Sequence, residues 1–115
     1  MKYLVLIFSN TEAPWTGSDE ELQSLQGLFA LREELTGTGE LVSSEGLSLP
    51  EDGKVVRVRD GARVVTDGPF GEAKEQVAGY FLIDCADEER ADEIAGQVSA
   101  LVRDRVEVRG VVLSG

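Results

Sequence analysis

Two segments of the chain are apolar at almost every position, Tyr3–Phe8 and Val77–Ile83. Both are rich in β-branched and aromatic residues, which favour strands, and a strand without a polar face has to be covered on both sides. We therefore predict that Lys2–Phe8 and Val77–Ile83 are strands at the centre of a sheet. Leu41–Leu47 is predicted as a short strand. Arg105–Leu113 alternates apolar and polar residues and is predicted as a strand at the edge.

Capping residues and the spacing of apolar residues predict two helices. The run Ser18-Asp19-Glu20-Glu21 matches a capping box, in which Ser18 and Glu21 satisfy each other's backbone N–H groups, and Gly37 or Gly39 ends the helix. A second helix begins after Asp87. The spacing of apolar residues gives each helix one apolar face. These residues are Leu22, Leu25, Leu28, Phe29 and Leu35 in the first helix and Ala91, Ile94, Ala95, Val98, Leu101 and Val102 in the second.

Between the helices, Lys54–Arg59 and Ala62–Thr66 flank the dipeptide Asp60-Gly61. Asp-Gly supplies the positive φ angles of a two-residue turn between strands, so this segment predicts a β-hairpin. The arginines of the hairpin have two interpretations. They form the solvated face of a ribbon, or they bind an anion; the residues are Arg57, Arg59 and Arg63.

The hairpin runs into Val64–Gln76, which contains Asp67-Gly68-Pro69-Phe70-Gly71. Pro69 fixes its own φ and restricts Gly68, and glycine permits backbone angles closed to other residues, so the turn is predicted to be stiff, with Gly68 in a conformation that disfavours a side chain. A stiff turn places Asp67, Phe70 and Lys74 reproducibly. That geometry serves a binding site, but a tight β corner requires it equally.

The elements follow in the order β, α, β, hairpin, β, α, β. This order predicts an α+β fold, a ferredoxin-like split βαβ plan with an inserted β-hairpin. Right-handed crossovers place both helices on one face of the sheet, which leaves the other face of the central strands uncovered. A second subunit would cover that face, so we expect a homodimer in which two sheets form a dimeric α+β barrel.

Composition limits the partners. The 115 residues fit one domain, spanning 1–115, and the net charge of −11 disfavours nucleic acids and anionic membranes. No apolar run approaches the ~20 residues of a membrane span, and no cleavable leader is evident after Met1, so we expect a cytoplasmic protein. Cys85, the single cysteine, is interpreted as a buried reduced thiol.

Several runs resemble the YCII-related proteins of the "DGPF" type. The most specific is Val65-Thr66-Asp67-Gly68-Pro69-Phe70, followed by Glu72-Ala73-Lys74-Glu75-Gln76 and then Gly79-Tyr80-Phe81-Leu82-Ile83-Asp84. The resemblance covers nearly the whole chain. It implies a dimeric α+β barrel, functions that are mostly unassigned, and relatives acting on small cyclic or halogenated aromatic metabolites through a histidine paired with an aspartate. It also implies a regulatory role beside alternative sigma factors.

The chain has no histidine, so that acid/base pair is incomplete. Asp67 is the candidate acid/base group, although an aspartate at the start of a turn more often accepts backbone N–H groups. Without histidine, and with one cysteine, no loop has the spacing of a metal site, and no motif indicates a cofactor.

Two hypotheses for the function stay open. The first is a small-molecule-binding or accessory module, acting through a regulatory protein partner. The second is a lyase or isomerase of small cyclic or aromatic metabolites that uses Asp67. For either, we expect Asp67, Phe70, Lys74 and Glu45 near a cleft. Trp15, in the loop after the first strand, either covers this cleft or anchors on the core. Acidic surroundings favour a neutral or cationic hydrophobic ligand.

Overall fold

The computed structural model describes residues 1–10, 15–68 and 75–115 of the chain. The order of its elements confirms the predicted plan, with one short 3₁₀ helix, η1, added before the hairpin. The elements are β1 (Lys2–Asn10), α1 (Asp19–Thr38), β2 (Leu41–Gly46), η1 (Pro50–Asp52), β3 (Lys54–Arg59), β4 (Ala62–Asp67), β5 (Glu75–Asp84), α2 (Glu88–Val102) and β6 (Glu107–Gly110).

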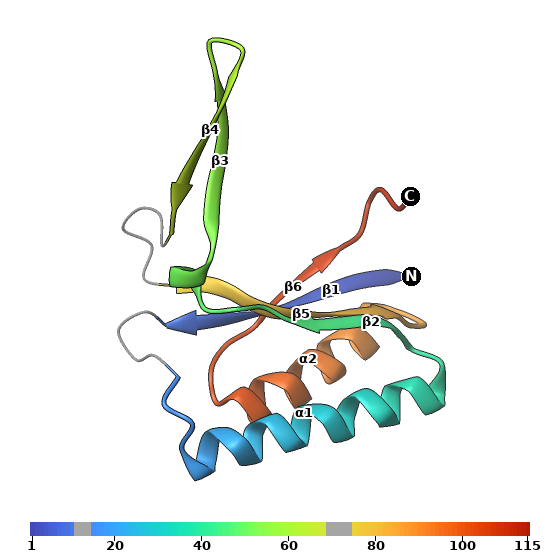
Figure 1. Cartoon of the computed structure of the whole chain (residues 1–115). Helices are drawn as coiled ribbons and strands as arrows, with labels where there is room; N and C mark the ends of the chain where they lie inside the picture. Colours follow the sequence, from blue (N-terminus) through green and yellow to red (C-terminus); the bar gives the residue numbers. More distant parts are fainter. Residues whose placement is uncertain (11–14, 69–74) are drawn as a thin grey trace.

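Four strands form one antiparallel sheet in the order β2-β5-β1-β6. The two segments that lack a polar face, β1 and β5, lie at its centre and pair with each other, with Val5 opposite Phe81 and Leu6 opposite Tyr80. This is the strand order of the ferredoxin-like plan, so the predicted fold class is confirmed. Both helices cover the same face of the sheet (Figure 1).

The core lies between that face and the helices. Side chains alternate along a strand, so Tyr3 and Val5 of β1 point toward the helices together with Phe81 and Ile83 of β5. The helices contribute the remaining large side chains. The buried apolar residues are Tyr3, Val5, Leu31, Leu35, Phe81, Ile83, Cys85, Ala91, Ile94, Ala95 and Val98. Cys85 is thus a buried free thiol, and burial raises its pKa.

The opposite face of the sheet carries no helix. Its central positions are apolar and only half-buried within the single chain: Leu4 and Leu6 of β1 lie opposite Leu82 and Tyr80 of β5. We call these four residues the helix-free face. A second subunit over the helix-free face remains a prediction.

Both predicted caps of α1 are present. Ser18 accepts a hydrogen bond from the backbone N–H of Glu21, whose carboxylate accepts from the backbone N–H of Ser18, and Gly39 closes the helix with a φ of 80°. The predicted apolar face of this helix is only partly right. Leu35 is buried, but Leu25 and Phe29 are exposed, because a cleft separates this half of α1 from the sheet.

The second helix behaves as predicted. Asp87 accepts a hydrogen bond from the backbone N–H of Arg90, and Ala91, Ile94, Ala95 and Val98 are buried.

The last strand is shorter than the predicted Arg105–Leu113. Only Glu107–Gly110 forms a strand: it ends opposite Tyr3 because β1 begins at Lys2, and Arg105 and Val106 belong to the connection from α2.

The hairpin forms its own two-stranded sheet, and in the described part of the chain it pairs with no strand of the main sheet. Asp60 and Gly61 adopt φ angles of 53° and 77°, which confirms the predicted turn. In Figure 1 the hairpin rises away from the sheet on the side opposite the helices. We call Lys54–Asp67 the arm.

Candidate functional site

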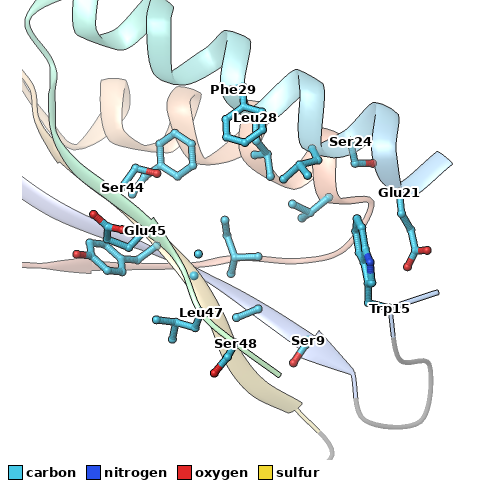
Figure 2. A pocket seen from close by; sticks show the side chains of 18 of the residues that line it. Ser9, Trp15, Glu21, Ser24, Leu28, Phe29, Ser44, Glu45, Leu47 and Ser48 are labelled. Atoms are coloured by element: carbon cyan, nitrogen blue, oxygen red, sulfur yellow. The ribbon is translucent and has the colours of Figure 1, made fainter. Parts of the chain in front are cut away.

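A cleft of about 760 Å³ opens between the N-terminal half of α1 and the sheet. Figure 2 shows Leu28 and Phe29 of α1 along one side, and Leu47 and Ser48, which follow β2, along the other. Trp15 stands at one end. Ligand sites commonly have volumes of about 300–1,000 Å³, so a small molecule fits.

The walls of the cleft are mainly apolar. Several of these apolar side chains are exposed, with Phe29 53% and Trp15 49% accessible. A large apolar side chain that lines a concavity without being covered gains about 25 cal/mol per Å² when a ligand removes it from water. The apolar lining residues are Ile7, Trp15, Leu25, Leu28, Phe29, Leu47, Leu49, Ala78, Phe81 and Val102.

Small residues keep part of the cleft open. Ala78 and Gly79 of β5 both line it. A Cβ atom on Gly79 would lie 2.7 Å from the carbonyl oxygen of Glu45 and 3.4 Å from Cα of Gly46, both in the neighbouring strand β2. This contact is too short for a side chain, so the close approach of β2 and β5 requires glycine here.

The capping box of α1 also organises the end of the cleft that holds Trp15. The carboxylate of Glu21 accepts hydrogen bonds from the backbone N–H and the hydroxyl of Thr16 as well as from Ser18. These bonds favour the charged form, so they lower the pKa of Glu21 to about 2. Because Thr16 directly follows Trp15, the hydrogen bonds of Glu21 hold the segment that carries the indole.

Acidic groups outnumber basic ones around the cleft. Among the residues that the structure describes, Glu21, Glu45 and Asp52 line it, against one guanidinium, that of Arg32. Within residues 1–10, 15–68 and 75–115, neither Glu45, Asp52 nor Arg32 takes part in an ion pair. The electrostatic field of the lining is therefore negative overall, while Arg32 supplies one local positive charge.

The structure brings together two of the five predicted site residues. Trp15 and Glu45 both line the cleft. Asp67 lies at the end of β4, exposed and opposite Lys54, and it is not among the residues that line the cleft. Phe70 and Lys74 lie outside the described residues. A ligand-binding role for these five residues stays a prediction.

Gly68 links the arm to one wall of the cleft. Its N–H donates a hydrogen bond of 2.8 Å to the carbonyl of Gly53, and a Cβ atom here would lie 2.8 Å from the carbonyl oxygen of Pro50. This crowding agrees with the prediction that Gly68 disfavours a side chain, but φ of Gly68 is not in the left-handed region. Crowding by η1, rather than the φ angle, disfavours a side chain.

Sequence reasoning missed most of the lining. Leu25, Leu28 and Phe29 have the spacing of an ordinary core face, and periodicity cannot distinguish the wall of a cleft from the core. One signal was available. Leu47 and Leu49 stand in a polar segment without a periodic pattern, which is where exposed apolar residues indicate a surface of interaction.

Two further observations concern metal binding and membrane-spanning helices. In the part of the chain that the structure describes, no group of three or more carboxylate or thiol side chains is arranged to hold a metal ion. Within the same residues, neither α1 nor α2 combines the length and the hydropathy needed to cross a bilayer.

Comparison with known proteins identifies the family. Residues 1–113 match the YCII-related domain. An uncharacterised protein of Rhizobium meliloti (strain 1021) is 31% identical over 101 residues, which cover 86% of this chain and 81% of that protein. These matches agree with the resemblance found in the DGPF segment, and the chain belongs to the YCII-related family.

Proposed function

We propose that the protein is a binding module for a small, planar, hydrophobic molecule, neutral or cationic, which lies in the cleft between α1 and the sheet. One observation carries this proposal: the cleft leaves Trp15, Leu25 and Phe29 uncovered on its walls. A single chain gains nothing from apolar side chains that face an open concavity, whereas a bound ring would cover them.

The charge of the lining argues for the class of ligand. Three carboxylates and one guanidinium of the described residues line the cleft, and the whole chain carries a net charge of −11. A polyanion such as a nucleotide would enter against this field. A planar ring that stacks on Trp15 or Phe29 gains about 0.5–1.5 kcal/mol beyond its buried area, and a cationic substituent gains further from the carboxylates.

We propose a cytoplasmic accessory role for this module, in which the liganded protein acts through a protein partner. The alternative, a lyase or isomerase that uses Asp67, stays a prediction without a supporting contact. Asp67 is exposed on the arm and is not part of the lining. Of the carboxylates that line the cleft, Glu21 is engaged by Thr16 and Ser18.

The family fold leads us to propose a homodimer as well. Leu4, Leu6, Tyr80 and Leu82 form a continuous half-buried apolar face at the centre of the sheet. A stable pairing would bury about 1,200–2,000 Å² in total. Light scattering should therefore report twice the mass of 12.4 kDa, and Leu6→Glu should dissociate the dimer or unfold the chain. A wild-type monomer at millimolar concentration would refute this proposal.

The emission of Trp15, the single tryptophan, tests the ligand site directly. Benzyl alcohol, benzylamine and benzoate share one ring and differ in charge. We expect saturable changes in emission with benzyl alcohol and benzylamine at lower concentrations than with benzoate. Phe29→Ala should weaken binding of the first two probes, because it removes one aromatic wall while its exposure limits the cost to folding.

Val112→Ala is the matched control, because Val112 is a fully exposed apolar residue after β6 and is not among the residues that line the cleft. It should leave the titrations unchanged. Two results would contradict the proposal. The first is equal binding by wild-type protein and Phe29→Ala. The second is a preference for benzoate or for ATP over the neutral and cationic probes.

A further inference from the structure

Among the described residues, no strand outside the arm pairs with it. Its two strands pair with each other. Every residue of the arm is exposed except Val55, which is half-buried. An isolated two-stranded hairpin is marginally stable in water. A ribbon of this length that is kept extended therefore requires a surface to lie against.

One face of the arm is suited to packing. Residues directly opposite each other share a face, and Val56 lies opposite Val65, with Val58 two positions further along. All three are exposed, Val58 to 75%. Three uncovered valines on one face of a ribbon form an apolar stripe that a protein surface would cover.

The charge of the arm is opposite to that of the rest of the chain. It holds four of the eleven basic residues and only two of the twenty-two acidic ones. Within the described residues, no ion pair uses Arg59 or Arg63. The strongly acidic remainder of a second copy is thus electrostatically complementary to the arm.

The position of the arm fits a second copy seated on the helix-free face. The arm rises on that side of the sheet (Figure 1). Its six-residue strands span about 20 Å at ~3.3 Å per residue, and facing sheets pack about 10 Å apart. The tip therefore extends past the facing sheet toward the helix layer behind it.

We propose that the arm is a clasp, which lies along the side of a second copy of this chain and holds it through the Val56–Val58–Val65 stripe and the basic residues that share its face, Lys54 and Arg63. Because a twofold dimer is self-complementary, each chain contributes one clasp and receives one. This inference rests on the proposed homodimer. It goes beyond that dimer by assigning the hairpin to the interface.

Photo-crosslinking tests the contact. Val58 is replaced by p-benzoylphenylalanine, a change that its exposure makes tolerable, and the full-length protein is irradiated. We expect a covalent product of twice the chain mass on a denaturing gel, with the crosslinked peptide belonging to the second copy. A product formed only within one chain, or none while the protein is dimeric, would overturn the clasp.

Charge reversal tests the electrostatic part. Arg63→Glu should raise the dissociation constant of the dimer about tenfold at low salt, and 0.5 M NaCl should reduce the difference. Arg59→Glu, on the other face of the ribbon, should raise it less. Arg103→Glu is the matched control, because it changes the net charge equally at the end of α2, in the acidic part of the chain. It should not weaken the dimer.

The outcomes separate the two proposals. A wild-type protein that stays monomeric refutes the homodimer itself. Suppose that the wild-type protein is a dimer and that Arg59→Glu, Arg63→Glu and Arg103→Glu all have the wild-type dissociation constant. This result refutes the clasp and leaves the homodimer standing. Equal weakening by all three variants indicates general repulsion between acidic chains, which also refutes the clasp.

Discussion

Gly79→Ala is expected to destabilise the protein, although it adds only one methyl group. The added Cβ would lie 2.7 Å from the carbonyl oxygen of Glu45 and 3.4 Å from Cα of Gly46. Both neighbours are backbone atoms of β2, so relief requires a shift of the strand rather than of a flexible side chain. Overpacking of this kind costs about 1–3 kcal/mol, which corresponds to a fall in Tm of about 4–12 °C.

Gly96→Ala is the matched control for this prediction. Gly96 lies in α2, where an added Cβ meets nothing within 4 Å, so alanine should stabilise the helix by up to about 1 kcal/mol. Thermal unfolding followed by circular dichroism, at one fixed protein concentration, measures both variants. A Tm of Gly79→Ala equal to or above that of the wild type would refute the close approach of β2 and β5 and the shape of the cleft that depends on it.

Three other substitutions have predicted outcomes. Gly68→Ala should lower the free energy of unfolding by about 1–3 kcal/mol, since its Cβ would press on the carbonyl of Pro50; an unchanged urea midpoint would show that η1 yields freely. Glu40→Gln should lower it by about 1–2 kcal/mol at pH 7, because Glu40 accepts hydrogen bonds from Arg90, which lower the pKa of the carboxyl from 4.5 to about 2. A carboxyl whose pKa is lowered by folding stabilises the fold above pH 4.5, and this contribution is lost as the pH falls toward 2. The variant should therefore lose less stability than the wild type over this range. Parallel curves of unfolding free energy against pH for the two proteins would contradict the assignment. Ser18→Ala should lower the free energy of unfolding by about 1 kcal/mol and alter the emission of Trp15, because it removes one of the two hydrogen-bonding partners of the capping box. Unchanged emission would show that the capping box does not position the indole.

Much of the fold was predictable because it depends on patterns local to each segment. The absence of a polar face in β1 and β5 identified the central strands, and Asp60-Gly61 identified the hairpin turn. Ser18 and Asp87 marked the beginnings of the helices. In each case one residue type meets a requirement of the backbone or of burial that few others meet.

The cleft was less predictable because it depends on where α1 stands relative to the sheet. Helical spacing made Leu25 and Phe29 indistinguishable from Leu35, yet only Leu35 is buried. The C-terminal end of the last strand has a similar cause, since it is set by the position at which β1 begins. Gly68 shows the same limit. Its neighbours in the sequence indicated an unusual φ, whereas the constraint comes from the carbonyl of Pro50.

The most direct test of the proposed function is to map the binding of benzylamine to the protein by the chemical shifts of its backbone amides in a nitrogen–proton NMR titration. We predict saturable shifts along both sides of the cleft, in residues 21–32 of α1 and in residues 44–49 at the end of β2 and after it. The amides of the arm should stay unchanged. Saturable shifts confined to the helix-free face or the arm, with the amides of the cleft unaffected, would contradict the assignment of the cleft as the ligand site.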